Sequence, residues 1–152
     1  MDKQRQLAEA IRIAANSHRY QYDKGGKPYI LHPMHLMNQL LFDTQLATIA
    51  VLHDVVEDDP AWTIDDLGQM GFSRRVLVAL SDLTHTEGET YESYIENICG
   101  NYDAIRVKRK DLEHNSDITR LKGITEKDLA RIEKYHKAFV RLTEAKREFE
   151  RK

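Results

Sequence analysis

Apolar residues recur along most of this chain at the three- and four-residue spacing of an amphipathic α-helix. Residues 3–18 give a clear example, because Leu7, Ile11, Ala14 and His18 fall on one face of a helix drawn through them. No segment shows the sustained alternation of apolar and polar residues that is typical of a half-buried strand. We therefore predict an all-α fold with almost no sheet.

Capping residues, glycines and prolines divide this pattern into separate helices. The segment 19–33 holds two glycines and two prolines, so we predict a loop there. Thr44 is the predicted N-cap of a continuous helix that runs to about Glu57. The other predicted helices cover residues 3–18, residues 34–42, a short stretch between Thr63 and Gly71, a helix capped by Ser73, a helix from Thr90 to Gly100, residues 102–115, and a long final helix over about 125–150 that Thr125 caps.

Size, charge and cysteine content narrow the class of protein. The chain has 152 residues, which predicts a single domain over residues 1–152. A formal net charge of −2 gives no general basic field, so a duplex nucleic acid is not an expected partner. One cysteine allows no disulfide within the chain. Without a signal-like leader or an apolar run of about 18 residues, we expect a cytoplasmic protein that does not contact a membrane.

The dipeptide His53-Asp54 interrupts the apolar run from Ile49 to Val56. Burying an unpaired carboxylate there would cost several kcal/mol, so some partner must compensate for it. A metal ion or a cationic side chain could do so. The alternative is a His–Asp pair that satisfies itself within a helical core.

Two more acidic residues follow the dipeptide at helical spacing. On a continuous helix Glu57 lies one turn beyond His53, and Asp58 lies one turn beyond Asp54. The mutual repulsion of three carboxylates on one short surface would be relieved by a bound cation. The alternative is that Glu57 and Asp58 are solvated at a helix end, although acidic residues are unfavourable at a C-terminal turn.

Two distant segments could complete a coordination shell. His32 precedes Pro33 at a predicted junction between loop and helix, and Asp111 lies on the helix 102–115 with Asn115 one turn later. Together with His53-Asp54, these segments supply two histidines and two carboxylates. That donor set suits a divalent ion such as manganese, iron or zinc.

In order along the chain, the motifs Gly26–Pro33, Leu52–Asp58 and Val107-Lys108 followed by Asp111–Asn115 resemble the hydrolase domain of the RelA/SpoT family. The resemblance covers about residues 5–120. It implies an HD-superfamily helical bundle that removes the 3′-pyrophosphate from the alarmone (p)ppGpp in a manganese-dependent reaction. Because no length remains for synthetase or regulatory domains, the chain resembles the small stand-alone hydrolases of this family.

The resemblance also implies roles for individual residues. Lys108 is a further basic candidate for phosphate contact. Carried over by position, the implied metal ligands are His32, His53, Asp54 and Asp111. The implied acidic pair that positions or activates the attacking water is Glu57 and Asp58. The implied substrate contacts include Lys24 and Asn115.

The chain departs from the family pattern on the substrate side. It reads Asp23-Lys24 where the family usually has Arg-Lys, and Ser116-Asp117-Ile118 where the long enzymes have Met-Arg-Thr. An aspartate can neither stack on a base nor neutralise a phosphate as an arginine can. Two alternatives therefore stay open, namely an HD phosphohydrolase for a different phosphorylated nucleotide and a metal- or nucleotide-binding module without turnover. Nothing in the sequence predicts the oligomeric state.

Overall fold

The computed structural model describes all of residues 1–152 and is built from nine α-helices and one short 3-10 helix. The prediction of an all-α fold is confirmed, since the β structure is limited to an isolated bridge between Tyr22 and Pro28. The helices are α1 (Lys3–Ser17), α2 (Leu31–Gln39), α3 (Thr44–Leu52), α4 (Val55–Asp58), α5 (Ile64–Met70), α6 (Arg74–Leu83), α7 (Tyr91–Ile98), α8 (Tyr102–Asn115), η1 (Ile118–Arg120) and α9 (Glu126–Glu150).

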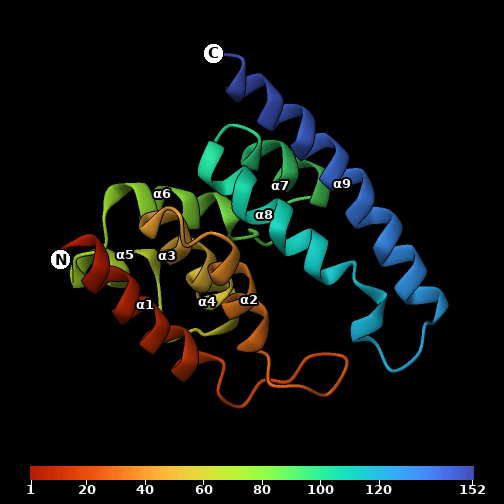
Figure 1. Cartoon of the computed structure of the whole chain (residues 1–152), viewed down its shortest axis with the longest axis horizontal. Helices are drawn as coiled ribbons and strands as arrows, with labels where there is room; N and C mark the ends of the chain where they lie inside the picture. Colours follow the sequence, from red (N-terminus) through yellow and green to blue (C-terminus); the bar gives the residue numbers. More distant parts are fainter.

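Helix α3 is the centre of the core. Every residue from Leu46 to Leu52 is buried, as expected for a helix that is apolar on all sides. It packs against α1, α2, α6 and α8, which surround it in Figure 1. The dipeptide His53-Asp54 follows α3 directly, so the packing of this helix brings both side chains into the middle of the molecule.

The long helix α9 covers one side of the molecule (Figure 1). It packs along α8 and α7 through Ala138, Leu142 and Ala145, which are its buried apolar residues. None of the helices combines the length and the apolar character that a bilayer-spanning segment requires. Through the packing of its buried apolar residues, α9 closes the α7–α8 side of the core. Its N-terminal end lies near the 3-10 helix η1 (Figure 1).

The predicted helix ends are confirmed where a local cap defines them. Thr63 and Thr125 each form a capping box with the aspartate three residues later. Gly71 ends α5 with a positive φ of 103°, a conformation that glycine adopts without a steric cost. These ends depend on residues close in sequence, which is why the pattern alone located them.

Several predicted helix boundaries are wrong. Helix α2 begins at Leu31 rather than at residue 34, because Pro33 falls in the first turn, where its missing N–H costs no helical hydrogen bond. Asp43, not Thr44, caps α3 by accepting hydrogen bonds from the backbone N–H groups of Gln45 and Leu46. The continuous helix predicted as far as Glu57 is also wrong, since α3 stops at Leu52 and α4 starts at Val55.

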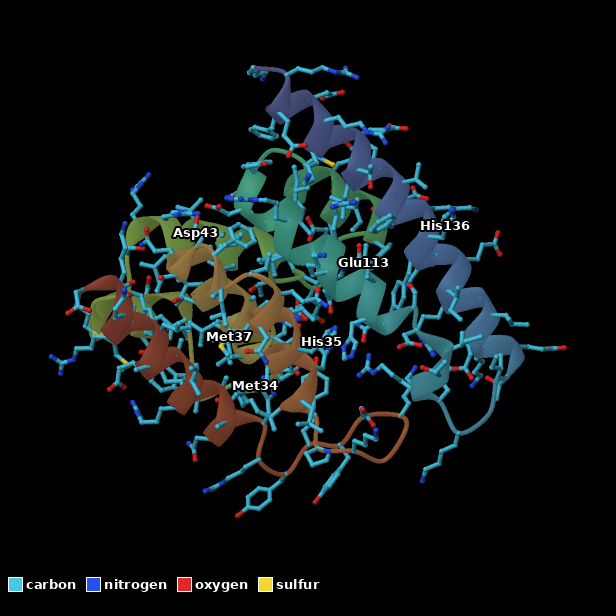
Figure 2. The ribbon with its side chains drawn as sticks, viewed as in Figure 1. Met34, His35, Met37, Asp43, Glu113 and His136 are labelled. Carbon is cyan, nitrogen blue, oxygen red and sulfur yellow. The ribbon has the colours of Figure 1, made fainter.

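Asp43 also joins α3 to α6, because it accepts hydrogen bonds from Arg75 on α6. Figure 2 labels Asp43 beside α6. Arg75 donates to Asp43 at 2.7 Å and to Asp103 at 2.8 Å, so one guanidinium links three helix ends. Burial raises the pKa of Asp43, but hydrogen bonds from Arg75 and from the Leu46 N–H outweigh this effect and hold the pKa below its ordinary value. The ionised form of Asp43 therefore stabilises the folded state.

We expect Asp43→Asn to lower the free energy of unfolding by about 1 kcal/mol at pH 7, because asparagine keeps the cap but loses the charge. The folded-state pKa of Asp43 is depressed, so the difference between wild type and variant should be constant above the unfolded pKa of about 3.9 and vanish as the pH falls through the folded pKa. Urea unfolding of both proteins between pH 2 and pH 7 measures this difference. A difference that persists at the lowest pH would contradict the electrostatic explanation.

Candidate metal centre

The interruption between α3 and α4 sets the geometry of the centre. Neighbouring residues on a regular helix do not face each other. Here the His53 N–H is 3.4 Å from the Ala50 carbonyl oxygen, and Asp54 has φ −107° and ψ −1°, so the regular hydrogen-bond pattern stops at this point. As a result, His53 Nε2 lies 3.0 Å from Asp54 Oδ2.

Four predicted side chains from three parts of the chain meet at this point. The ligand atoms of His32, His53 and Asp54 all lie within 4.8 Å of one another. Asp111 joins them from α8, with its Oδ1 atom 2.7 Å from His32 Nε2 and 3.4 Å from His53 Nε2. Asp54 is the most accessible member, with 21% of its side chain exposed, so the cluster opens to solvent on that side.

The orientation of His53 tests whether these residues fit a cation. Its Nδ1 is 2.7 Å from the Ala50 carbonyl oxygen, which fixes this nitrogen as a donor. Its Nε2 is buried and has no aligned hydrogen-bond partner, although Asp54 and Asp111 are close. Burial lowers the pKa of His53, but the two aspartates raise it well above its ordinary value. A buried imidazole nitrogen that has no aligned partner and faces two carboxylates is an arrangement that a divalent cation would complete, so the donor set fits one.

A third histidine orients His32. The Nδ1 atoms of His32 and His114 are 2.7 Å apart, so one ring donates to the other. Burial, followed by the charges of Arg120 and His32, lowers the pKa of His114 to about 4. A neutral His114 can accept from His32 Nδ1, which leaves His32 Nε2 free to act as a ligand. His114 also stacks on His35, which Figure 2 labels on α2 (ring centroids 3.9 Å apart).

The carboxylate of Asp111 is fixed from its own helix. Lys108 Nζ donates to Oδ2 at 2.8 Å, and Asn115 Nδ2 donates to Oδ1 at 2.9 Å. Burial raises the pKa of Asp111, but Lys108 and the two histidines together hold it well below its ordinary value. Lys108 and Asn115, both predicted as substrate contacts, are thus engaged with the cluster itself.

Glu57 and Asp58 do not extend the side-chain rows of His53 and Asp54 as predicted, because the helix between them is broken. Glu57 accepts a hydrogen bond from the backbone N–H of His85, and Asp58 accepts one from Gln21 Nε2 at 3.1 Å. Both carboxylates still line one cavity of about 560 Å³. Burial raises the pKa of each, and the charge of Asp54 raises both further.

A second cavity, of about 280 Å³, adjoins the cluster. Tyr29 and Asn115 line it and also donate to Asp54 and Asp111, respectively. Gln21 lies in the walls of both cavities, which places the acidic pair and the second cavity side by side. Three cationic side chains also line the second cavity, and these are Lys24, Arg120 and Arg131. Two acidic residues, Asp23 and Asp117, line it as well.

In sequence, the chain is similar to curated (p)ppGpp hydrolases. The bifunctional (p)ppGpp synthase/hydrolase SpoT of Escherichia coli K12 is 28% identical over 127 residues, which cover 75% of this chain and 18% of that protein. The guanosine-3′,5′-bis(diphosphate) 3′-pyrophosphohydrolase of Haemophilus influenzae is 41% identical over 51 residues, which cover 32% of this chain and 8% of that protein. No protein-family model matches.

The chain is similar to RelA/SpoT-type (p)ppGpp hydrolases. It spans less than a fifth of the length of the SpoT protein.

Several residues around the centre were not predicted from the sequence. His114 lies three residues beyond Asp111 on the same helix, and that spacing could have indicated its place beside the ligands. Tyr29 donates to Asp54 from the loop before α2, and Arg131 reaches the second cavity from α9. No spacing in the sequence links these two residues to the cluster, so they depended on the tertiary structure.

We expect His114→Phe to weaken manganese binding by about 10–100-fold, because the variant removes the acceptor that fixes the His32 tautomer. Phenylalanine keeps the ring that stacks on His35, so the fold should be retained. Titration of Mn²⁺ followed by electron paramagnetic resonance measures the affinity without depending on turnover. His136→Phe on α9 is the control, and an unchanged affinity in His114→Phe would contradict the role.

Proposed function

We propose that this chain is a metal-dependent phosphohydrolase of the HD type that removes the 3′-pyrophosphate from (p)ppGpp. The observation that carries the proposal is the meeting of His32, His53, Asp54 and Asp111 beside a cavity that three cationic side chains help to line. The similarity to SpoT supports the reaction class. In this proposal residues 1–152 form one hydrolase domain.

The four clustered residues would hold the cation, with manganese as the first ion to test. When bound there, such an ion supplies Lewis acidity to a phosphoryl oxygen and lowers the pKa of a water molecule. His114, Lys108 and Asn115 keep the ligands in place through the hydrogen bonds described above. The buried surroundings exclude competing water from three of the four ligands.

Glu57 and Asp58 fit the roles of proton acceptor and water-positioning group. Both carboxylates line the cavity of about 560 Å³, and Gln21 lies in the walls of both this cavity and the second cavity. A water molecule beside the two carboxylates can therefore approach a phosphate in the second cavity. The raised pKa of Glu57 brings this carboxylate closer to the range in which a general base works at neutral pH. The Gln21 hydrogen bond orients Asp58 toward the same space.

The walls of the second cavity suit a phosphorylated nucleotide. Lys24 is exposed at its rim, and Arg131 lines it from α9. Cationic side chains in such a wall bind phosphate oxygens, and Tyr135 offers an aromatic surface nearby. A ligand with two diphosphate groups and a base matches both kinds of surface.

The direct test is hydrolysis of guanosine 3′,5′-bis(diphosphate) by the purified protein with added Mn²⁺. We expect one pyrophosphate and one GDP for each molecule of substrate, with no pyrophosphate from GTP or ATP, which lack the 3′-diphosphate. Chelation with EDTA should stop the reaction. Absence of product in the presence of Mn²⁺, with the fold intact by circular dichroism, would refute the proposal.

Asp23 favours a second candidate substrate. An aspartate at this position cannot stack on a guanine, so a different 3′-phosphorylated nucleotide is a reasonable alternative for the same centre. A panel that includes adenosine and guanosine nucleotides with 3′-phosphates distinguishes the two. Tight binding of a nucleotide without any product would instead favour a binding module that lacks turnover.

A further inference from the structure

Two loops that are far apart in sequence meet at the side of the second cavity. The loop between α1 and α2 (residues 18–30) comes up against η1, as Figure 1 shows. At the meeting point Asp23 Oδ2 lies 3.5 Å from a guanidinium nitrogen of Arg120, and both side chains are mostly buried. A β-carbon on Gly25 would overlap the carbonyl oxygen of Arg120, so the two backbones touch with no room for a side chain.

The same guanidinium also reaches the residues that surround the metal centre. Arg120 Nη1 donates to the His114 carbonyl oxygen at 2.8 Å and to Asn115 Oδ1 at 3.3 Å. Because Arg120 occupies the amide oxygen of Asn115, the amide nitrogen is turned to Asp111. Arg120 thus connects the Asp23 loop with the end of α8 that carries the ligand Asp111.

The pair of Asp23 and Arg120 borders two cavities. Both residues line the cavity of about 280 Å³ that holds Lys24 and Arg131, and both line a cavity of about 230 Å³ beside His35. The position of this ion pair therefore helps to set the shape of both spaces.

The ion pair explains how an aspartate is compatible with a site for an anion. Burial raises the pKa of Asp23, but backbone N–H groups of Lys27 and Gly25, and then the Arg120 charge, hold the pKa below its ordinary value. The ionised carboxylate is turned to Arg120 and to its own loop. Its charge is therefore matched within the wall, which leaves Lys24 to face a phosphate, whereas Arg131 is paired with Asp128 at 2.6 Å.

We propose that Arg120 is a positioning residue that holds the Asp23 loop and the Asn115 amide in the shape that nucleotide binding in the second cavity needs. This inference rests on the proposed function for the identity of the ligand, but not for the tie between the two loops. Arg120 donates to three acceptors, the His114 carbonyl oxygen, Asn115 Oδ1 and Asp23 Oδ2. A planar guanidinium with several N–H donors can reach all three, and a lysine with a single charged nitrogen cannot replace it fully.

The first measurement is amide hydrogen exchange in the protein without nucleotide. The N–H groups of Asp23, Gly26 and Lys27 are hydrogen-bonded within the loop, and they report its opening. We expect Arg120→Gln to speed their exchange by about tenfold, and Asp23→Asn to do the same, because each removes one side of the tie. Arg141→Gln, which breaks an ion pair between α9 and Glu96 on α7, should leave these amides unchanged.

The second measurement is the split between KM and kcat for guanosine 3′,5′-bis(diphosphate) with Mn²⁺. Arg120→Gln should raise KM by about tenfold with a smaller change in kcat, since it disturbs the wall rather than the ligands. Arg120→Lys should recover the amide protection in part but not the KM, because it cannot bridge Asp23 and Asn115 together. Arg141→Gln should match the wild type in both constants.

Each outcome decides the proposal. Unchanged exchange in Arg120→Gln overturns it, and so does faster exchange with an unchanged KM, which would leave Arg120 a purely structural role. Full recovery by Arg120→Lys would overturn the requirement for a guanidinium. If the wild type fails to turn over the nucleotide, the proposed function fails separately, and calorimetric binding of the same nucleotide to wild type and Arg120→Gln replaces KM in the test.

Discussion

Replacing Asp54 by asparagine is expected to lower manganese-dependent turnover by at least about a thousandfold while the protein stays folded. Asparagine keeps the size of the side chain and an oxygen that can accept from Tyr29, but it removes the charge that faces His53. Burial raises the pKa of Asp54, and His53 outweighs this effect and lowers it to about 2, so the wild-type residue is ionised at neutral pH. The variant therefore loses the charge of a proposed metal ligand and little else.

The loss of the ligand should also appear in a measurement that does not depend on substrate. A cation that binds the folded state alone stabilises it by about 2.7 kcal/mol at a concentration one hundred times its Kd. We expect Mn²⁺ to raise the melting temperature of the wild type but not that of Asp54→Asn or His53→Ala. Asp65→Asn, an exposed aspartate on α5, is the matched control and should behave as the wild type does. Equal stabilisation of wild type and Asp54→Asn by Mn²⁺ would contradict the assignment.

Replacing Asp111 by alanine should lower the free energy of unfolding by about 3–5 kcal/mol, the largest effect on stability that we expect from one substitution. Only 13% of the Lys108 side chain is exposed, and its ammonium group depends on Asp111 at 2.8 Å. Without that carboxylate a buried charge is left unpaired. Relief of the repulsion between Asp54 and Asp111 acts in the opposite direction, but it does not restore a partner for Lys108.

A double substitution separates the ion pair from the packing around it. Lys108→Met should cost less than Asp111→Ala, because Asp111 keeps its hydrogen bonds with His32 and Asn115. Combining Lys108→Met with Asp111→Leu removes both charges, and we expect it to recover most of the stability while activity stays lost. Urea unfolding in the presence of EDTA measures all the variants without a contribution from metal. A double variant as unstable as Asp111→Ala would contradict this explanation.

The sequence alone determined those features that depend on neighbours along the chain. Helical spacing predicted an all-α fold, and the caps at Thr63, Ser73 and Thr125 located helix starts, because a cap satisfies N–H groups only two or three residues away. The sequence also named His32 and Asp111 as partners of the central dipeptide. Their residue types and the motif order indicated a shared centre, and the structure brings them within hydrogen-bond distance of each other.

Only the tertiary structure decided how the centre is shaped. No glycine or proline marks the break at His53-Asp54, so the apolar spacing alone predicted a continuous helix, and the break is seen only in the packed structure, where α3 lies among α1, α2, α6 and α8. The contact of His114 with His32 spans 82 residues, and that of Arg120 with Asp23 spans 97. A hydrogen bond across such a distance forms only after the helices between its partners have packed, which is why the four clustered residues could be named from the sequence and the side chains that hold them in place could not.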